Sequence, residues 1–185
     1  MILITGGSSS GKSEFAEQLV SEMGERRLYL ATGRVTDDEM AARVLKHQLR
    51  RGSLWQTVEG NPPEDPMAYD EYDGILLDSV TTWVTNLLFA SFEEDGQFVE
   101  PDWFKVDYRQ IEEMIIGSVR TFAQMAKVHD LPLVLVTDET GLGLVPDTPL
   151  GRAFRDMLGH VNQLLAGIAD DVYFVVSGIP MHIKG

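Results

Sequence analysis

One glycine-rich segment near the start of the chain constrains the fold more than any other part. Residues 1–5 are apolar or β-branched, Gly6–Ser13 reads GGSSSGKS, and helical periodicity follows from Phe15. The segment matches G-x-x-x-x-G-K-[ST] between a predicted strand and a predicted helix, which is the context that this motif requires. Glycines let backbone N–H groups close around phosphate oxygens, and the helix adds its unpaired N–H groups and positive dipole end. The segment therefore predicts a P-loop that binds a nucleotide.

The motif gives each of its residues a role. The residues expected to bind the nucleotide phosphates are Gly6, Gly7, Ser8, Ser9, Ser10, Gly11, Lys12 and Ser13. Lys12 should reach the outer phosphates as a catalytic residue, and the Ser13 hydroxyl should bind Mg²⁺. Asp78 ends an apolar strand, as a Walker-B carboxylate does, and is predicted to be the second Mg²⁺ ligand.

Length and charge limit the kind of protein. A chain of 185 residues suits one α/β domain, so we expect a single domain over residues 1–185. With 15 Lys and Arg against 29 Asp and Glu, the net charge of −14 argues against nucleic acid or an anionic membrane as partner. The absence of cysteine excludes disulfides, thiolate metal sites and a cysteine nucleophile. No apolar run approaches about 18 residues, so we predict a cytoplasmic protein without membrane insertion.

The order of the predicted elements indicates the fold class. Strands are expected near residues 1–5, 28–32, 75–78, 133–137 and 172–176, with helices between most of them. This alternation predicts an α/β, P-loop NTPase-like fold with a mainly parallel sheet and helices on both faces. A short edge strand is expected at 55–59, a polar loop at 91–101, and a C-terminal tail from residue 178.

A basic helix is predicted from about residue 37 to residue 51, after a capping box at Thr36. It contains His47 and four of the 15 basic residues, which are Arg43, Lys46, Arg50 and Arg51. Imidazole among cations can bind phosphate or attack it. Charge runs, however, usually mark solvated helix faces. The residues alone leave both interpretations open.

Two adjacent carboxylates, Asp138 and Glu139, end the predicted strand at 133–137. The carboxyl ends of parallel strands form the edge at which such sheets bind ligands. The pair could serve a metal, a ribose or an accepting hydroxyl group, or it could solvate a turn.

Several segments in a fixed order make the chain resemble one family, the bifunctional adenosylcobinamide kinase/adenosylcobinamide-phosphate guanylyltransferases of cobalamin biosynthesis. The matching segments are ILITGGSSSGKS, LYLATG, DDEMAARVLKHQLRR, ILLDSVTTWVTNLL, VTDETGLGLVP and SGIPMHIKG. The resemblance implies that ATP or GTP phosphorylates the hydroxyl of the aminopropanol arm of adenosylcobinamide. GMP from GTP then passes through an enzyme histidine to the cobinamide phosphate, which gives adenosylcobinamide-GDP.

The same resemblance assigns residues. It makes His47 the histidine that accepts GMP and gives Glu139 a role on the accepting hydroxyl. The implied nucleotide-lining residues are Ala31, Thr32, Gly33, Gln48, Leu49, Arg50, Arg51, Glu59 and Thr81. It also implies a homo-oligomer, for which a trimer is our expectation. Two positions depart from the family pattern: Gly52 stands where proline is common, and Asp138 where asparagine is common.

Two other functions fit a P-loop. One is a small-molecule kinase that forms no covalent intermediate, in which His47 only contacts phosphate. The other is a nucleotide-binding switch module, in which nucleotide orders a loop and no corrinoid is turned over.

Overall fold

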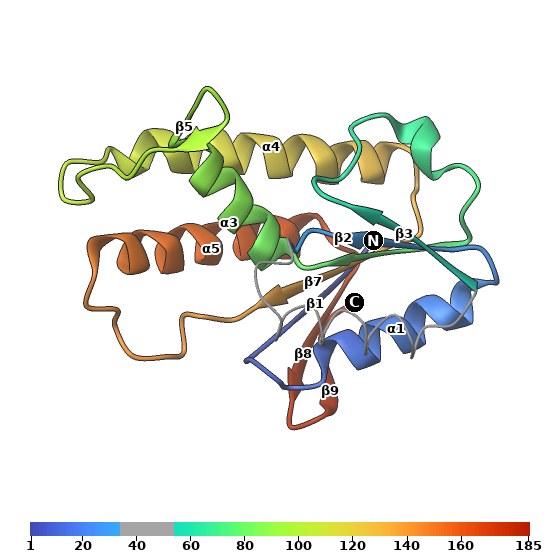
Figure 1. The fold of residues 1–185 in the computed structure, drawn as a ribbon. Helices are drawn as coiled ribbons and strands as arrows, with labels where there is room; N and C mark the ends of the chain where they lie inside the picture. The colour runs from blue at the N-terminus through green and yellow to red at the C-terminus, as the bar shows by residue number, and fades with distance from the viewer. Residues whose placement is uncertain (34–53) are drawn as a thin grey trace.

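A computed structural model describes residues 1–33 and 54–185 of the chain (Figure 1). The predicted basic helix at 37–51 falls between these two ranges. His47, Gln48, Leu49, Arg50 and Arg51 therefore lie outside the described residues.

A seven-stranded sheet forms the centre of the molecule. Its strands are β1 Ile2–Gly6, β2 Arg27–Ala31, β3 Trp55–Glu59, β4 Gly74–Asp78, β7 Leu133–Asp138, β8 Asp171–Val176 and β9 Ile179–Lys184, in the spatial order β3-β2-β4-β7-β1-β8-β9. All neighbours are parallel except β8 and β9. The five predicted strands and the predicted edge strand β3 are confirmed.

Helices cover both faces of the sheet, as predicted for this fold class (Figure 1). The helix that follows the glycine-rich loop, α1 Lys12–Met23, packs on one face. The other face carries α3 Val80–Ala90, α4 Tyr108–Val128 and α5 Pro149–Ile168. A 3₁₀ helix, η2 Pro66–Tyr69, precedes β4. The prediction of a single domain is not tested by this architecture and stays a prediction.

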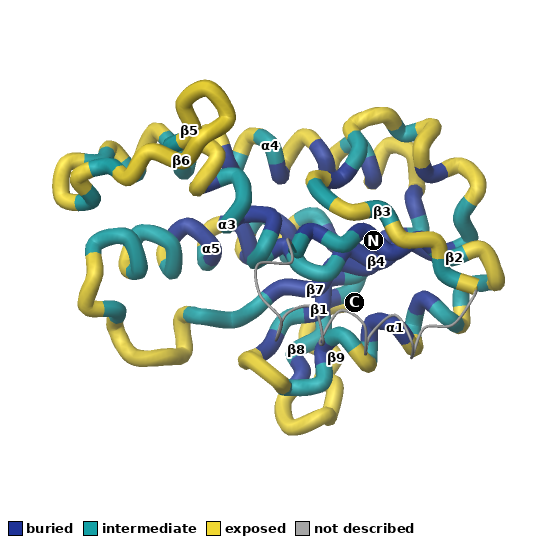
Figure 2. Tube along the Cα trace, viewed as in Figure 1, coloured by how far each residue is buried: buried dark blue, intermediate teal, exposed yellow. Residues whose placement is uncertain are grey.

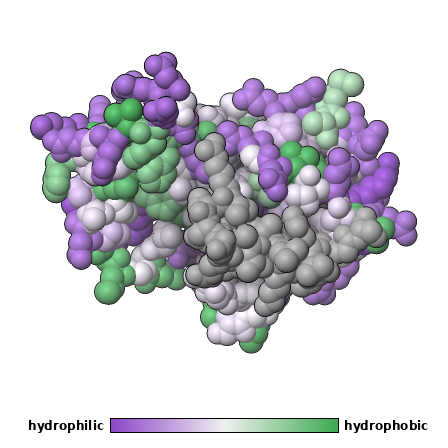
Figure 3. Space-filling model, in the orientation of Figure 1, coloured by the Kyte–Doolittle hydropathy of each residue, from purple (hydrophilic) through white to green (hydrophobic). Residues whose placement is uncertain are grey.

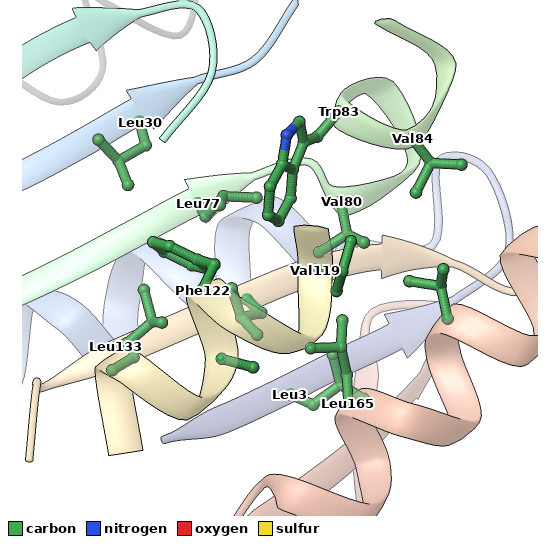
Figure 4. Packing of buried hydrophobic residues seen from close by; sticks show 14 of the residues in the cluster. Leu3, Leu30, Leu77, Val80, Trp83, Val84, Val119, Phe122, Leu133 and Leu165 are labelled. Carbon is green, nitrogen blue, oxygen red and sulfur yellow. The ribbon is translucent and has the colours of Figure 1, made fainter. Parts of the chain in front are cut away.

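The core lies in two layers, because successive residues of a buried strand point to opposite faces of the sheet. Leu3, Leu77 and Leu133 face α3, α4 and α5, whereas Ile4 and Leu76 face α1. The central strands β4, β7 and β1 are buried (Figure 2). In the larger layer, Trp83 and Phe122 meet edge to face with ring centroids 5.4 Å apart (Figure 4). This geometry suits the opposite charges of a ring face and a ring edge.

Two hairpins differ from the sequence-based expectations. The expected polar loop at 91–101 contains β5 Glu93–Glu94 and β6 Gln97–Phe98, and the expected tail contains β9. Both turns use two successive residues with positive φ, which are Asp95 and Gly96 (51° and 76°) and Ser177 and Gly178 (52° and 79°). Such turns match the twist of a two-stranded hairpin. The loop and tail predictions were therefore wrong at these positions.

Candidate functional site

The glycine-rich loop joins β1 to α1 as the motif predicts. Gly11 is the N-cap of α1 and has φ 95°, a left-handed conformation that favours glycine. A Cβ on Gly6 would lie 2.4 Å from the Val175 carbonyl oxygen, so the loop can pass β8 only without a side chain. The Gly178 N–H donates to the Ser10 carbonyl at 2.8 Å, which ties the β8–β9 turn to the loop.

Lys12, the first residue of α1, is buried at the base of this loop. Its side chain is 8% exposed, and its Nζ donates to the Gly7 carbonyl at 2.6 Å. The same Nζ forms an ion pair with Asp138 Oδ1 at 2.8 Å. The lysine is therefore held inside the turn of the loop, with a carboxylate from the end of β7 as its counter-ion.

Asp78 and Asp138 lie on the same side of the sheet as the glycine-rich loop. Leu76 and Val136 pack in the α1 layer, and side chains two residues further along a strand point to the same side. Asp78 Oδ2 accepts a hydrogen bond from the Tyr29 hydroxyl at 3.1 Å. The two carboxylates end strands that are direct neighbours in the sheet.

This donor set fits Mg²⁺ bound with a nucleotide. No group of three His, Cys, Asp or Glu side chains that could hold a metal occurs within 1–33 and 54–185. Mg²⁺ in P-loop sites does not need such a group, because phosphates and waters supply most of its ligands. A serine hydroxyl at the start of α1 and one carboxylate on the α1 side are sufficient. The assignment of Ser13 and Asp78 to Mg²⁺ stays a prediction.

The predicted nucleotide-lining residues of β2 and β3 lie at the same sheet edge. Glu59 pairs in register with Ala31 and is exposed, and the Gly60 N–H donates to the Ala31 carbonyl at 2.9 Å. Thr32 is fully buried, and its hydroxyl exchanges hydrogen bonds with the Ser79 backbone at 2.8 and 2.9 Å. The Thr32 hydroxyl is therefore engaged in joining the end of β2 to the start of α3.

A partly buried polar network fixes the backbone of Asp138. Its N–H donates to Thr81 Oγ1 at 2.8 Å, and its carbonyl accepts from Asn162 Nδ2 at 3.0 Å. Asn162 Oδ1 accepts from the Thr137 hydroxyl at 2.7 Å. Thr81, predicted as a nucleotide contact, thus supports Asp138 in this structure. The sequence analysis did not select Asn162; the available signal was a polar residue on the inner, apolar face of α5.

Glu139 faces away from Lys12, towards α5. Its N–H donates to the Gly6 carbonyl at 2.9 Å, and its Oε1 accepts from the Gly141 N–H at 2.8 Å. Its side chain lines a cavity beside α5 and β8. The side chains of the adjacent residues Asp138 and Glu139 therefore point to opposite sides of the sheet edge.

Comparison with known proteins shows the family of the chain. The family model described as cobinamide kinase / cobinamide phosphate guanyltransferase matches residues 2–183. The chain belongs to this family. It is 42% identical to the bifunctional adenosylcobalamin biosynthesis protein CobU of Escherichia coli K12 over 100% of this chain and 99% of that protein. The CobU of Salmonella typhimurium LT2 is likewise 42% identical with the same coverage. CobP of Pseudomonas aeruginosa PAO1 is 34% identical over 99% of this chain and 96% of that protein.

A solved structure supports the fold class of this family member. A prototypical ATPase from the type III secretion system of pathogenic bacteria superposes with a TM-score of 0.51 and 14% identity. The match covers 98% of this chain and 56% of that ATPase, and it shows the fold alone. In the described part of the chain, no helix has the length and apolar character needed to cross a bilayer.

Proposed function

We propose that this chain phosphorylates adenosylcobinamide with ATP or GTP and then transfers GMP from GTP to the resulting phosphate, giving adenosylcobinamide-GDP. The observation that carries the proposal is the family match over residues 2–183 to a chain with a complete P-loop motif. The buried Lys12 in that loop and the carboxylates of Asp78, Asp138 and Glu139 at the same sheet edge support phosphoryl transfer.

In the kinase step, the hydroxyl oxygen of the aminopropanol arm forms a bond to the γ-phosphorus. The bond between that phosphorus and the bridging oxygen breaks, and the nucleoside diphosphate leaves. Glu139 takes the hydroxyl proton, and Lys12 offsets charge on the phosphates. Mg²⁺, when bound through Ser13 and Asp78, would neutralise charge on the phosphate oxygens.

In the transfer step, an imidazole nitrogen of His47 attacks the α-phosphorus of GTP, and pyrophosphate leaves. A phosphate oxygen of the corrinoid then displaces the nitrogen and takes the guanylyl group. His47 is assigned by its place in the segment DDEMAARVLKHQLRR. Four cations close to His47 in the sequence would offset charge on the phosphate under attack, namely Arg43, Lys46, Arg50 and Arg51.

The test of the transfer step is incubation with Mg²⁺ and GTP labelled at the α-phosphate, followed by denaturation. A phosphoramidate predicts protein-bound label that survives base, is lost in acid and is absent from His47→Ala. His129→Ala, at the exposed C-cap of α4, is the matched control and should keep the label. Absence of label from the wild type would favour a P-loop kinase without a covalent intermediate. Absence of corrinoid phosphorylation as well would favour the switch module.

The test of the kinase step is Glu139→Gln. Loss of a general base typically lowers turnover about 10²- to 10⁴-fold. Nucleotide affinity should change far less, because Glu139 faces α5 and Lys12 lies on the other side of the sheet edge. Turnover equal to that of the wild type would contradict this role.

The assembly and location of the protein are further proposals. The family resemblance supports a homo-oligomer, with a trimer as the expected form, and the lack of a long apolar run in the sequence supports a cytoplasmic location. Light scattering on the purified protein would give the mass of the assembly directly, and a monomer would contradict this proposal.

A further inference from the structure

A cavity of about 660 Å³ lies between α5 and the β1–β8–β9 side of the sheet. Glu139 and Gly141 stand at one end, and Leu3, Val172 and Ile183 contribute apolar lining. Its size is within the range of small-molecule sites in proteins. The cavity therefore begins at the proposed base of the kinase step and extends away from the glycine-rich loop along α5.

The wall provided by α5 is polar. Arg155, Asp156, His160 and Gln163 line it, so both hydrogen-bond donors and acceptors face the cavity. His160 Nδ1 is also paired with Glu112 of α4, which fixes this part of the wall. On the sheet side, Thr5 of β1 also lines the cavity, and its buried hydroxyl makes no hydrogen bond with any described residue. A ligand with several amide groups would find partners along this wall.

The opposite side of the cavity continues into exposed apolar surface. Ile183 lines the cavity, and the alternate residues Met181 and Ile179 share its face of β9. These three side chains are 59%, 48% and 65% exposed. Figure 3 shows hydrophobic atoms at the tip of this hairpin. An exposed apolar strip that adjoins a polar cavity is typical of a binding surface.

We propose that this cavity and the adjoining face of β9, which we call the α5–β9 cleft, bind the corrinoid acceptor. The inference rests on the proposed function. A corrin ring has two largely apolar faces and a rim of amide side chains, which matches one apolar and one polar wall. The ring is larger than the cavity, so the arm-bearing edge enters it and a ring face lies against Ile183 and Met181.

The placement of the two substrates supports this assignment. The nucleotide is expected on the α1 side of the sheet edge, where Lys12, Asp78 and Asp138 lie. The cleft opens on the α5 side. In-line phosphoryl transfer needs the attacking oxygen and the leaving oxygen on opposite sides of the phosphorus. An acceptor in the cleft would approach from the required side, with its hydroxyl beside Glu139.

Gly159 of α5 offers a sharp test, because it lines the cavity and a Cβ there would meet no atom within 4 Å. Gly159→Leu should place a side chain into the cavity, since its Cβ has room. Gly117→Leu on α4 is the matched control, since Gly117 is helical, exposed and equally free of neighbours. Equilibrium dialysis with dicyanocobinamide, read by corrin absorbance, should give a dissociation constant raised about tenfold or more only in Gly159→Leu.

A second pair of variants addresses the apolar wall without altering the helix. Ile183→Glu should also weaken dicyanocobinamide binding. Val128, the last residue of α4, is 80% exposed, and Val128→Glu should leave this binding unchanged. An unchanged dissociation constant in both Gly159→Leu and Ile183→Glu would overturn the proposal. The proposal would also be overturned if Ile183→Glu formed a smaller assembly than the wild type but bound the corrinoid with unchanged affinity. The apolar face of β9 would then belong to a contact with a second copy of the chain.

Guanylylation of the enzyme separates this inference from the proposed function. That half-reaction needs GTP and no acceptor, so Gly159→Leu should take up α-label as the wild type does. If the wild type takes label and phosphorylates cobinamide while both Gly159→Leu and Ile183→Glu bind cobinamide normally, only the cleft assignment fails. If the wild type does neither, the proposed function fails and the cleft assignment fails with it.

Discussion

Lys12 Nζ lies 2.8 Å from Asp138 Oδ1, so the lysine of the P-loop motif is paired with the carboxylate that ends β7. The lysine side chain is 8% exposed and the aspartate side chain 35%, so solvent screens the pair only in part. A nucleotide phosphate that binds Lys12 must compete with this carboxylate. An asparagine at this position would leave Lys12 without this counter-ion, so the competition depends on the charge of Asp138.

Asp138→Asn should strengthen nucleotide binding in the absence of Mg²⁺. Removal of a partly screened counter-ion is worth about 1 kcal/mol, which corresponds to a dissociation constant lowered roughly three- to tenfold. The measurement is titration calorimetry with GTP in EDTA. Asp95→Asn, at an exposed hairpin turn, is the matched control and should leave the affinity unchanged. Weaker binding of Mg²⁺-free GTP by Asp138→Asn would contradict the competition.

Thr81→Val should destabilise the fold, because it removes the acceptor of the Asp138 N–H while keeping the shape of the side chain. A fully buried donor left without a partner costs about 1–3 kcal/mol in the free energy of unfolding. The Asp138 N–H is partly buried, so we expect a loss in the lower part of this range. Urea denaturation measures this loss, and Thr81→Ser should restore most of it.

Thr121→Val is the control for this substitution. The Thr121 hydroxyl donates only to the Gly117 carbonyl of its own helix and is exposed, so little change in stability is expected. If Thr81→Val lost nucleotide affinity with its stability intact, the hydroxyl would act on the nucleotide and not on Asp138.

Asn162→Leu should be more damaging, because it deprives both the Thr137 hydroxyl and the Asp138 carbonyl of a partner. We expect the free energy of unfolding to fall by about 2–4 kcal/mol. Since the network holds the backbone that leads into Glu139, kinase kcat should fall more than the KM for nucleotide rises. The exposed Gln124→Leu on α4 is the control. Unchanged stability would show that the network contributes little.

Asp170 should contribute to the loss of stability in acid. The Lys127 side chain, followed by the N-terminal ammonium group, lowers the pKa of this carboxyl from 3.8 to about 2. A lowered pKa in the folded state stabilises the protein above the unfolded pKa, and this contribution disappears as the pH falls towards the folded pKa. Asp170→Asn should therefore be less stable than the wild type at neutral pH.

The comparison of the two proteins across pH is the measurement. The difference in their free energies of unfolding should be constant above about pH 5 and shrink towards zero near pH 2. A difference that does not vary with pH would mean that the carboxyl does not act through its ionisation.

Local pattern predicted much of the fold. The glycine-rich loop between strand and helix is confirmed. Its tight turn needs residues without a side chain, and the glycines within Gly6–Ser13 supply them locally. The two hairpins were missed because their local sequence signals are weak. The strands of β5–β6 are only two residues each, and β9 is recognisable mainly from the Ser177–Gly178 turn that sends the chain back along β8.

The sequence by itself determined the order of the six parallel strands, the nucleotide-binding loop and the kinds of side chain at the carboxyl edge of the sheet. Only the tertiary structure decided how neighbouring carboxylates divide between the two sides of that edge. Asp138 meets Lys12, while Glu139 lines the α5–β9 cleft. The reason is that their partners come from distant elements: α1 supplies Lys12, α3 supplies Thr81 and α5 supplies Asn162. Such contacts have no local pattern, since they depend on how the helices pack on the sheet.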